Sequence, residues 1–186
     1  MARVVGDTLV LAVVAIVVLL SHRLGAGIAA LSGLAAFAVS QTFGAGWTPT
    51  TDAVVRRGAE ITTLASLLWV VSRAVYAPGR ITSARLQGAA VIYLSIGSLF
   101  ASAYGLIWAL TPGAFANLQG VPGSDSATAE LLYFSLTTLT TVGYGDILAV
   151  DPFARSLANL ESVTGVFYIA ITVTRLVTLE LAGRRR

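Results

Sequence analysis

Five long apolar segments dominate this chain of 186 residues, and they restrict its fold more than any other feature. They cover residues 4–21, 25–43, 59–77, 86–110 and 154–182. A helix needs about 20 apolar residues to cross the ~30 Å hydrocarbon layer of a membrane. A membrane-spanning barrel would need short alternating strands instead, and these do not appear. We therefore expect an all-α membrane protein with about five transmembrane helices.

Composition and charge exclude several other classes. Only 11% of the residues are charged, against about 25% in soluble domains. The chain has no cysteine, which excludes disulfides and thiolate metal sites. Its net charge of +3 comes from arginines spread among the apolar segments, which indicates membrane topology rather than a nucleic-acid surface. We expect no cofactor and no catalytic activity.

The arginines also predict the orientation of the chain. Five spans put the loops at 44–58 and 111–153 on one side of the membrane, and eight of the twelve arginines then lie on the other side. These eight are Arg23, Arg73, Arg80, Arg85, Arg175, Arg184, Arg185 and Arg186. Because positive charge favours the cytoplasmic side, we expect the N-terminus outside and the C-terminus in the cytoplasm.

A shorter apolar stretch, residues 127–139, is too short to span a membrane and runs directly into the sequence TTLTTVGYGD at 137–146. We expect a half-spanning helix here, with Ser126 as its N-cap and Glu130 complementing the positive end of its dipole. Its C-terminal end would point into the centre of the membrane, where a partial negative charge favours a cation.

The glycines that follow predict a special backbone. Non-helical backbone at membrane depth must be buried in protein or line a water-filled path. Gly143 and Gly145 can take positive φ at alternate positions, so that a row of carbonyl oxygens replaces the hydration shell of an ion. Thr141 can add a hydroxyl oxygen. Val142 and Tyr144 would point away and wedge the segment against the helix behind it.

The six residues from Thr141 to Asp146, TVGYGD, resemble the signature of the potassium channels, in the same context of a spanning helix before and after. The resemblance implies a homotetramer around a central pore and K⁺ as the permeant ion. It also implies stacked potassium sites, an outer mouth stabilised by Asp146, and a bacterial inner membrane as the location. The potassium sites would be formed by Thr141, Val142, Gly143, Tyr144 and Gly145.

The resemblance also divides the chain into two parts. Residues 80–186 look like the pore module of bacterial ion channels, and residues 1–79 would form about three peripheral helices. The filter is followed by ILAVD, without the proline often seen there. Arg73, Arg80 and Arg85 are too widely spaced for an arginine-array voltage sensor. We expect no cytoplasmic ligand-binding domain, and no partners beyond further copies of the chain and membrane lipids.

The last apolar segment carries candidate gating residues. Gly165 is a candidate hinge of the inner helix, and close packing against a neighbouring helix is the alternative. An apolar row at helical spacing below it can close a pore by dewetting, or can pack on another helix. This row consists of Val166, Ile169, Val173 and Val177.

Two further features of the apolar segments invite an interpretation. Glu161 is a candidate brace behind the filter, either hydrogen-bonded to Thr137 or Thr138 or protonated, and an ion pair with Arg155 is the alternative. The ladder of small residues from Gly97 to Gly105 predicts close packing against the inner helix.

Taken together, these features predict a potassium-selective channel that conducts passively. Three rivals remain from the sequence: a poorly selective cation channel, a potassium transporter with repeated pore loops, and a non-conducting subunit of other pore chains. A single intact TVGYGD argues against the second, because such transporters carry four degenerate loops in one chain.

Overall fold

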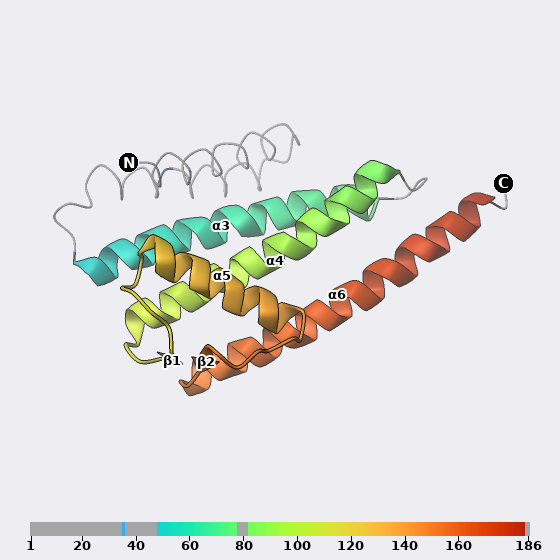
Figure 1. Cartoon of the computed structure of the whole chain (residues 1–186). Coiled ribbons are helices and arrows are strands. Elements are labelled where there is room, and N and C mark those ends of the chain that lie inside the picture. The colour runs from blue at the N-terminus through green and yellow to red at the C-terminus, as the bar shows by residue number, and fades with distance from the viewer. Residues whose placement is uncertain (1–34, 36–47, 78–81, 185–186) are drawn as a thin grey trace.

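The computed structural model describes residues 48–77 and 82–184, together with residue 35 (Figure 1). The described part is mostly helical and includes four helices of several turns each. They are α3 Pro49–Val75, α4 Ser83–Leu110, α5 Asp125–Leu139 and α6 Pro152–Arg184. The two predicted spans at 4–21 and 25–43 lie outside the described residues, apart from residue 35.

Three of these helices are long and apolar enough to cross a membrane, over Thr50–Val75, Arg85–Leu110 and Pro152–Arg175. This confirms the all-α prediction for the described part, and three of the five predicted spans. The predicted start of α3 is wrong: the helix begins at Pro49, inside the segment expected to be a polar loop. Thr48 caps it by accepting a hydrogen bond from the amide of Thr51, and Pro49 suits the first turn.

The short helix α5 ends at Leu139, as predicted, but its N-cap is Ser124 and not Ser126. The Ser124 hydroxyl accepts a hydrogen bond of 3.2 Å from the amide of Ala127. Glu130 accepts one of 2.8 Å from the amide of Gln119. Glu130 was expected to complement the positive end of the helix dipole. Its carboxylate also binds the loop before α5 through this hydrogen bond.

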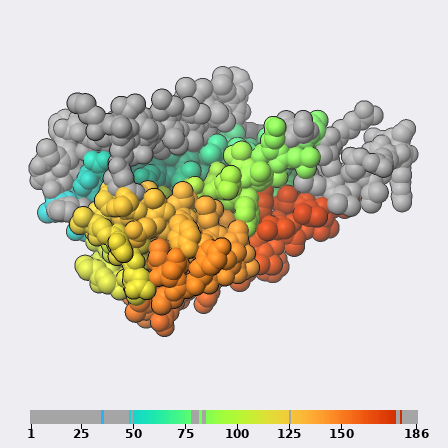
Figure 2. All heavy atoms as spheres, viewed as in Figure 1, coloured from blue at the N-terminus to red at the C-terminus, as the bar shows by residue number. Residues whose placement is uncertain are grey.

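The described helices and strands are arranged so that α5 lies beside α4 and α6, at the end of the molecule where α6 begins (Figure 1). Two short strands, β1 Phe115–Ala116 and β2 Leu148–Ala149, pair antiparallel at that same end. They join the loop before α5 to the segment after it, and no sequence pattern predicted them. In the space-filling view these loops, α5 and the start of α6 form one continuous surface (Figure 2, yellow to orange).

The core at this end is aromatic. The rings of Tyr104, Phe115 and Phe134 meet edge to face, with centroids 5.1 to 5.6 Å apart. Each ring comes from a different element, so the trio joins α4, β1 and α5. Pairs of this kind contribute about 0.5–1.5 kcal/mol beyond the burial of their area.

The small residues of α4 do allow close packing, but not against the predicted partner. A side chain at Gly97 would meet Leu136 of α5 at 2.8 Å, and one at Gly105 would meet Arg57 of α3 at 2.7 Å. The expected partner was the last long helix. The ladder therefore accommodates α5 and α3, not α6.

Helix α6 is covered little by its own chain. Only 17% of its apolar span is buried, against 44% for α4. Large apolar side chains project from most of its length: Phe153, Leu160, Val163, Val166, Phe167, Ile169, Ile171 and Val173 are all exposed.

Candidate functional site

The segment between α5 and β2, residues 140–147, has an unusual backbone. Thr141, Gly143 and Gly145 have positive φ angles of 60°, 52° and 78°. The two glycines were expected to take this conformation, and Thr141 extends it to a third alternate position. Backbone that alternates in this way aligns successive peptide groups, so their oxygens can line one side of the segment.

The beginning of this segment folds back onto α5. The carbonyl oxygen of Thr137 accepts hydrogen bonds from the amides of Val142, at 2.9 Å, and Gly143, at 3.1 Å. The amide of Thr141 donates to the carbonyl of Thr138 at 2.9 Å. The position of the segment is therefore set by the last turn of α5.

The far end of the segment is organised by Tyr133, which the sequence reading missed. Its hydroxyl donates to Oδ2 of Asp146 at 2.7 Å. Its ring stacks on Tyr144, with centroids 6.3 Å apart and planes 2° from parallel. The hydrogen bond lowers the pKa of the Asp146 carboxyl below its ordinary value. The side chain of Asn117 donates to the backbone oxygen of Asp146 at 3.0 Å.

The wedge expected of Val142 and Tyr144 against the helix behind the segment is formed only in part. Val142 and Tyr144 are 53% and 70% exposed in the single chain, so they do not fill a space behind it. Among the ring contacts of the described residues, Tyr144 contacts α5 only through its stacking on Tyr133. The described residues of this chain therefore do not enclose either side chain.

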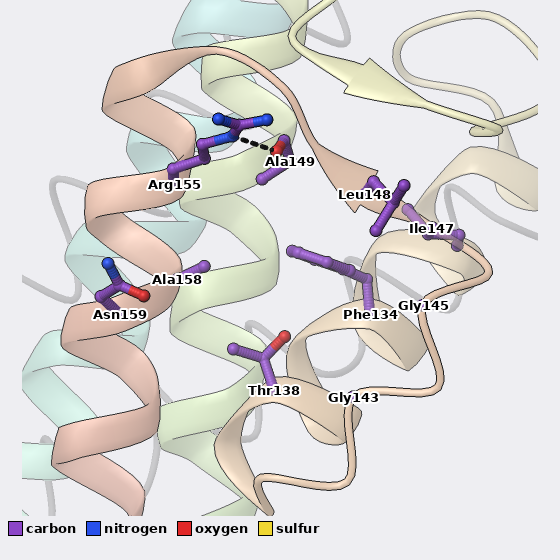
Figure 3. A pocket seen from close by; sticks show the side chains of 10 residues that line it. All are labelled: Phe134, Thr138, Gly143, Gly145, Ile147, Leu148, Ala149, Arg155, Ala158 and Asn159. Atoms are coloured by element: carbon purple, nitrogen blue, oxygen red, sulfur yellow. Dashed lines mark hydrogen bonds between the residues drawn. The ribbon is translucent and has the colours of Figure 1, made fainter.

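A cavity of about 340 Å³ lies between α5, this segment and the first turns of α6 (Figure 3). Phe134 and Thr138 of α5 border it on one side, and Ala158 and Asn159 of α6 border it on the other. Gly143 and Gly145 form part of its wall. The non-helical segment is therefore bordered by open space as well as by protein.

Arg155, also at this cavity, is not the partner of Glu161. Its Nε donates to the backbone oxygen of Ala149 at 2.9 Å (Figure 3). The proposed partners Thr137 and Thr138 do not bond to Glu161 either. Glu161 is fully buried, and instead it bonds to Tyr104 of α4 and Ser135 of α5.

The C-terminal end of α5 is held by the two neighbouring helices. The hydroxyl of Tyr93 donates to the carbonyl of Leu139 at 3.3 Å, and that of Ser162 donates to the carbonyl of Thr138 at 3.2 Å. A side chain at Gly165 would come within 2.1 Å of the Leu139 oxygen. The close-packing interpretation of Gly165 thus has a structural reason, and α6 runs through this residue without a break.

The candidate gate residues lie on the exposed part of α6. Val166, Ile169 and Val173 are each about half exposed. The side chain of Val177 lies outside the described residues. The single chain therefore leaves these three side chains uncovered, and their contacts within an assembly stay a prediction.

A buried polar cluster between α3, α4 and α5 was also missed. Arg57 is 6% exposed and pairs with Glu60 at 2.8 Å, and it also donates to the hydroxyl of Thr128 in α5 at 2.9 Å. Ser102 of α4 donates to the same carboxylate at 2.9 Å. These contacts connect α3 directly to α4 and α5.

Comparison with known proteins identifies the part of the chain that contains this site. A family model described as "Ion channel" matches residues 86–180. The potassium channel protein kcv of Paramecium bursaria Chlorella virus 1 is 33% identical over 85 residues, which cover 45% of this chain and 85% of the viral protein.

Two longer proteins also match part of the chain. The inward rectifier potassium channel Kirbac3.1 of Paramagnetospirillum magnetotacticum is 29% identical over 87 residues, which cover 45% of this chain and 25% of the relative. The potassium voltage-gated channel protein shk-1 of Caenorhabditis elegans is 34% identical over 62 residues, 33% of this chain and 12% of the relative. No solved structure gives a significant match.

Proposed function

The chain belongs to the ion channel family, and from this premise we propose that it forms a potassium-selective channel that conducts passively across a membrane. The names of the relatives support potassium as the ion, because all three are described as potassium channels. The long apolar helices make it a multi-pass membrane protein.

One observation carries this proposal: the positive φ angles at Thr141, Gly143 and Gly145. In this reading the oxygens of residues 141–145 replace the water that a K⁺ ion loses on entering the pore. The sites would be formed by Thr141, Val142, Gly143, Tyr144 and Gly145. Asp146 would stabilise the outer mouth through its bond to Tyr133.

A ring of oxygens needs more than one copy of the segment, since one chain supplies a single one. We propose four copies around a common axis, as the resemblance implies. The uncovered side chains of Val142 and Tyr144 and the exposed flank of α6 support such an assembly. In it, neighbouring copies and lipid would cover these surfaces.

The remaining roles follow from the same arrangement. The apolar row Val166, Ile169, Val173 and Val177 would line the inner part of the pore and close it by dewetting. Gly165 would serve as the hinge above this row. Helix α3 would belong to a peripheral layer around the pore module of residues 80–186.

The charge distribution and the family resemblance support a proposal for the membrane and the orientation of the chain. Eight of the twelve arginines lie on the side of the membrane opposite to the loop at 111–153 if the chain has five spans. Positive charge favours the cytoplasm, so that side would be cytoplasmic and the 140–147 segment would face outward. We propose a bacterial inner membrane, with the N-terminus outside. We also propose gating without an arginine array: of the α3 arginines, Arg56 and Arg57 are paired with Asp52 and Glu60.

Ion flux into liposomes that contain the purified chain tests the proposal. We expect uptake of potassium and rubidium but not of sodium. Equal flux of all three would indicate a poorly selective cation channel, and no flux would indicate a subunit that does not conduct alone. Either result would overturn potassium selectivity for this chain by itself.

A matched pair of glycines sharpens this test. Gly143 and Gly123 both have positive φ, and a side chain at either would meet nothing within 4 Å. Alanine is disfavoured at both positions, and the strain is greater at Gly123, whose φ of 89° lies outside the left-handed region that contains the 52° of Gly143. We expect Gly143→Ala to abolish discrimination between potassium and sodium, and Gly123→Ala to preserve it. Equal effects would show that fold strain, not the carbonyl row, determines the flux.

A further inference from the structure

Three fully buried polar side chains meet behind the 140–147 segment, each from a different helix: Tyr104 of α4, Ser135 of α5 and Glu161 of α6. We call them the Glu161 triad. The Tyr104 hydroxyl lies 2.6 Å from Oε2 of Glu161. The Ser135 hydroxyl is hydrogen-bonded to Oε1 of Glu161, and it also lies 2.7 Å from the backbone oxygen of Gly97.

The number of hydrogens in this cluster is limited. Ser135 has one hydroxyl proton, and the carbonyl oxygen of Gly97 can only accept. Both contacts of Ser135 are satisfied together only when its proton goes to Gly97 and its oxygen accepts a proton from Glu161. Tyr104 then donates to the other oxygen of Glu161. Every hydrogen in the triad is used, and each one has an acceptor.

An ionised Glu161 leaves this cluster one hydrogen short. The carboxylate would take the proton of Ser135, and the oxygens of Ser135 and Gly97 would then face each other at 2.7 Å with nothing between them. Two lone pairs at that distance repel. The geometry therefore fits a carboxylic acid and not a carboxylate.

Among the described residues, no cation contacts Glu161 to compensate a charge. From α4 the titratable groups facing Glu161 are Tyr104 and Tyr93. From α5 the polar neighbour is Ser135, and the nearest arginine on α6, Arg155, bonds to Ala149. Arg56 and Arg57 pair with Asp52 and Glu60, within α3. An unpaired charge buried inside a membrane protein is strongly disfavoured.

We propose that Glu161 is held as the neutral acid and that its proton locks α5 to α4 and α6. The role in ion selection rests on the proposed function. Ser135 lies on the same helix as Thr137, whose carbonyl holds the amides of Val142 and Gly143. Glu161 is therefore a positioning residue: it fixes the helix from which the carbonyl-bearing segment departs.

Infrared spectroscopy of the full-length protein in lipid tests the protonation state without any need for conduction. We expect the carbonyl stretching band of a neutral carboxylic acid at neutral pH, and its loss in Glu161→Gln. The control Glu130→Gln should leave the band unchanged, because Glu130 is partly exposed at the loop before α5. Absence of the band in the unaltered protein, or its survival in Glu161→Gln, overturns the proposal.

Flux measurements test the positioning role. The amide of Glu161→Gln can donate to Ser135 and accept from Tyr104, so we expect potassium selectivity to be retained. Glu161→Leu and Ser135→Ala should each lose potassium selectivity. The double variant should lose no more than either single variant, because each of the three removes the same hydrogen bond between Glu161 and Ser135. Loss in Glu161→Gln equal to that in Glu161→Leu overturns the role.

The two experiments also separate this inference from the function on which it rests. Unselective flux in the unaltered protein contradicts the proposed function, while the infrared band still decides whether Glu161 carries a proton. A band with the expected behaviour then supports the neutral acid as a structural lock alone.

Discussion

Tyr76, the residue directly after α3, shares a hydrogen bond with Thr172 of α6: their hydroxyl oxygens lie 2.6 Å apart. Arg175, one turn further along α6, donates to the backbone oxygen of Tyr76 at 2.7 Å and places its guanidinium 5.3 Å from the centre of the same ring. The C-terminal half of α6 is therefore attached to the end of α3, although little of α6 is buried by the described residues.

Removal of the hydroxyl in Tyr76→Phe should weaken this attachment without removing the ring. A hydrogen bond between helices in a membrane contributes about 0.6 kcal/mol on average. We expect the free energy of unfolding in a denaturing-detergent titration to fall by about that amount. Thr178→Val serves as control, because Thr178 bonds only within its own helix among the contacts described. An equal change in both would contradict an attachment between α3 and α6.

Alanine at Gly165 should be much more damaging than alanine at Gly58. The added carbon would lie 2.1 Å from the backbone oxygen of Leu139, whereas nothing lies within 4 Å of the corresponding atom at Gly58. Forced overpacking costs about 1–3 kcal/mol, while Gly58→Ala should be neutral or favourable by about 0.5–1 kcal/mol. The free energies of unfolding of the two variants check this. If Gly165 acts as a hinge alone, Gly165→Ala will unfold like the unaltered protein and differ only in gating.

The long helices were the most predictable part of the fold. The apolar segments at 86–110 and 154–182 match α4, Ser83–Leu110, and α6, Pro152–Arg184, closely. Backbone in a lipid environment must satisfy its own hydrogen bonds, so an apolar run of this length has few alternatives to a helix. The start of α3 was missed because its first turns are polar. Their charges are neutralised by partners that composition does not reveal.

Arg57 should prove far more important to stability than its neighbour Arg56. Arg57 is buried and pairs with Glu60, while the Arg56–Asp52 pair keeps about a third of each side chain exposed. Loss of one partner from a buried pair costs about 3–5 kcal/mol. Because Glu60 is still 25% exposed, we expect about 2–3 kcal/mol for Arg57→Ala.

For the control Arg56→Ala we expect less than about 1 kcal/mol, as for surface pairs in general. The free energies of unfolding of the two variants in the same detergent titration give the comparison. Similar losses would mean that the burial of Arg57 and its contacts with Glu60 and Thr128 add nothing to stability.

The acidity of Asp146 should depend on the hydroxyl of Tyr133. Its hydrogen bond lowers the pKa of Asp146, so this stabilising contact is present above the ordinary pKa of aspartate and is lost as the pH falls through the lowered value. Tyr133→Phe should move the titration midpoint of Asp146 upward, toward the ordinary value. Carbon NMR of the labelled carboxyl group measures this midpoint.

Tyr144→Phe is the matched control for this titration. It keeps the ring stacked on Tyr133 and removes a hydroxyl that makes no described bond to Asp146. We expect its midpoint to equal that of the unaltered protein. A midpoint in Tyr133→Phe that also stays in place would show that another group sets the acidity of Asp146.

Side-chain partners at the site were harder to predict than its backbone. Glycine can adopt positive φ whatever its neighbours are, so this backbone conformation could be predicted for Gly143 and Gly145 from residue type alone. Glu161 was expected to bond to Thr137 or Thr138 because a buried carboxyl group needs a hydroxyl partner and these threonines were expected on the short helix, but the rotation of α5 about its axis presents Ser135 to it. Such rotations depend on packing across the whole core. The contact between Arg57 and Thr128 joins residues 71 positions apart, beyond any local pattern.

The oxygen of Thr137 accepts hydrogen bonds from two successive amides, those of Val142 and Gly143. A carbonyl oxygen has two lone pairs, so it can accept from both amides at once. Because a single atom of α5 anchors both peptide groups, any displacement of that carbonyl would shift the two of them in the same direction. A small movement of the last turn of α5 would thus be passed directly to two consecutive peptide groups.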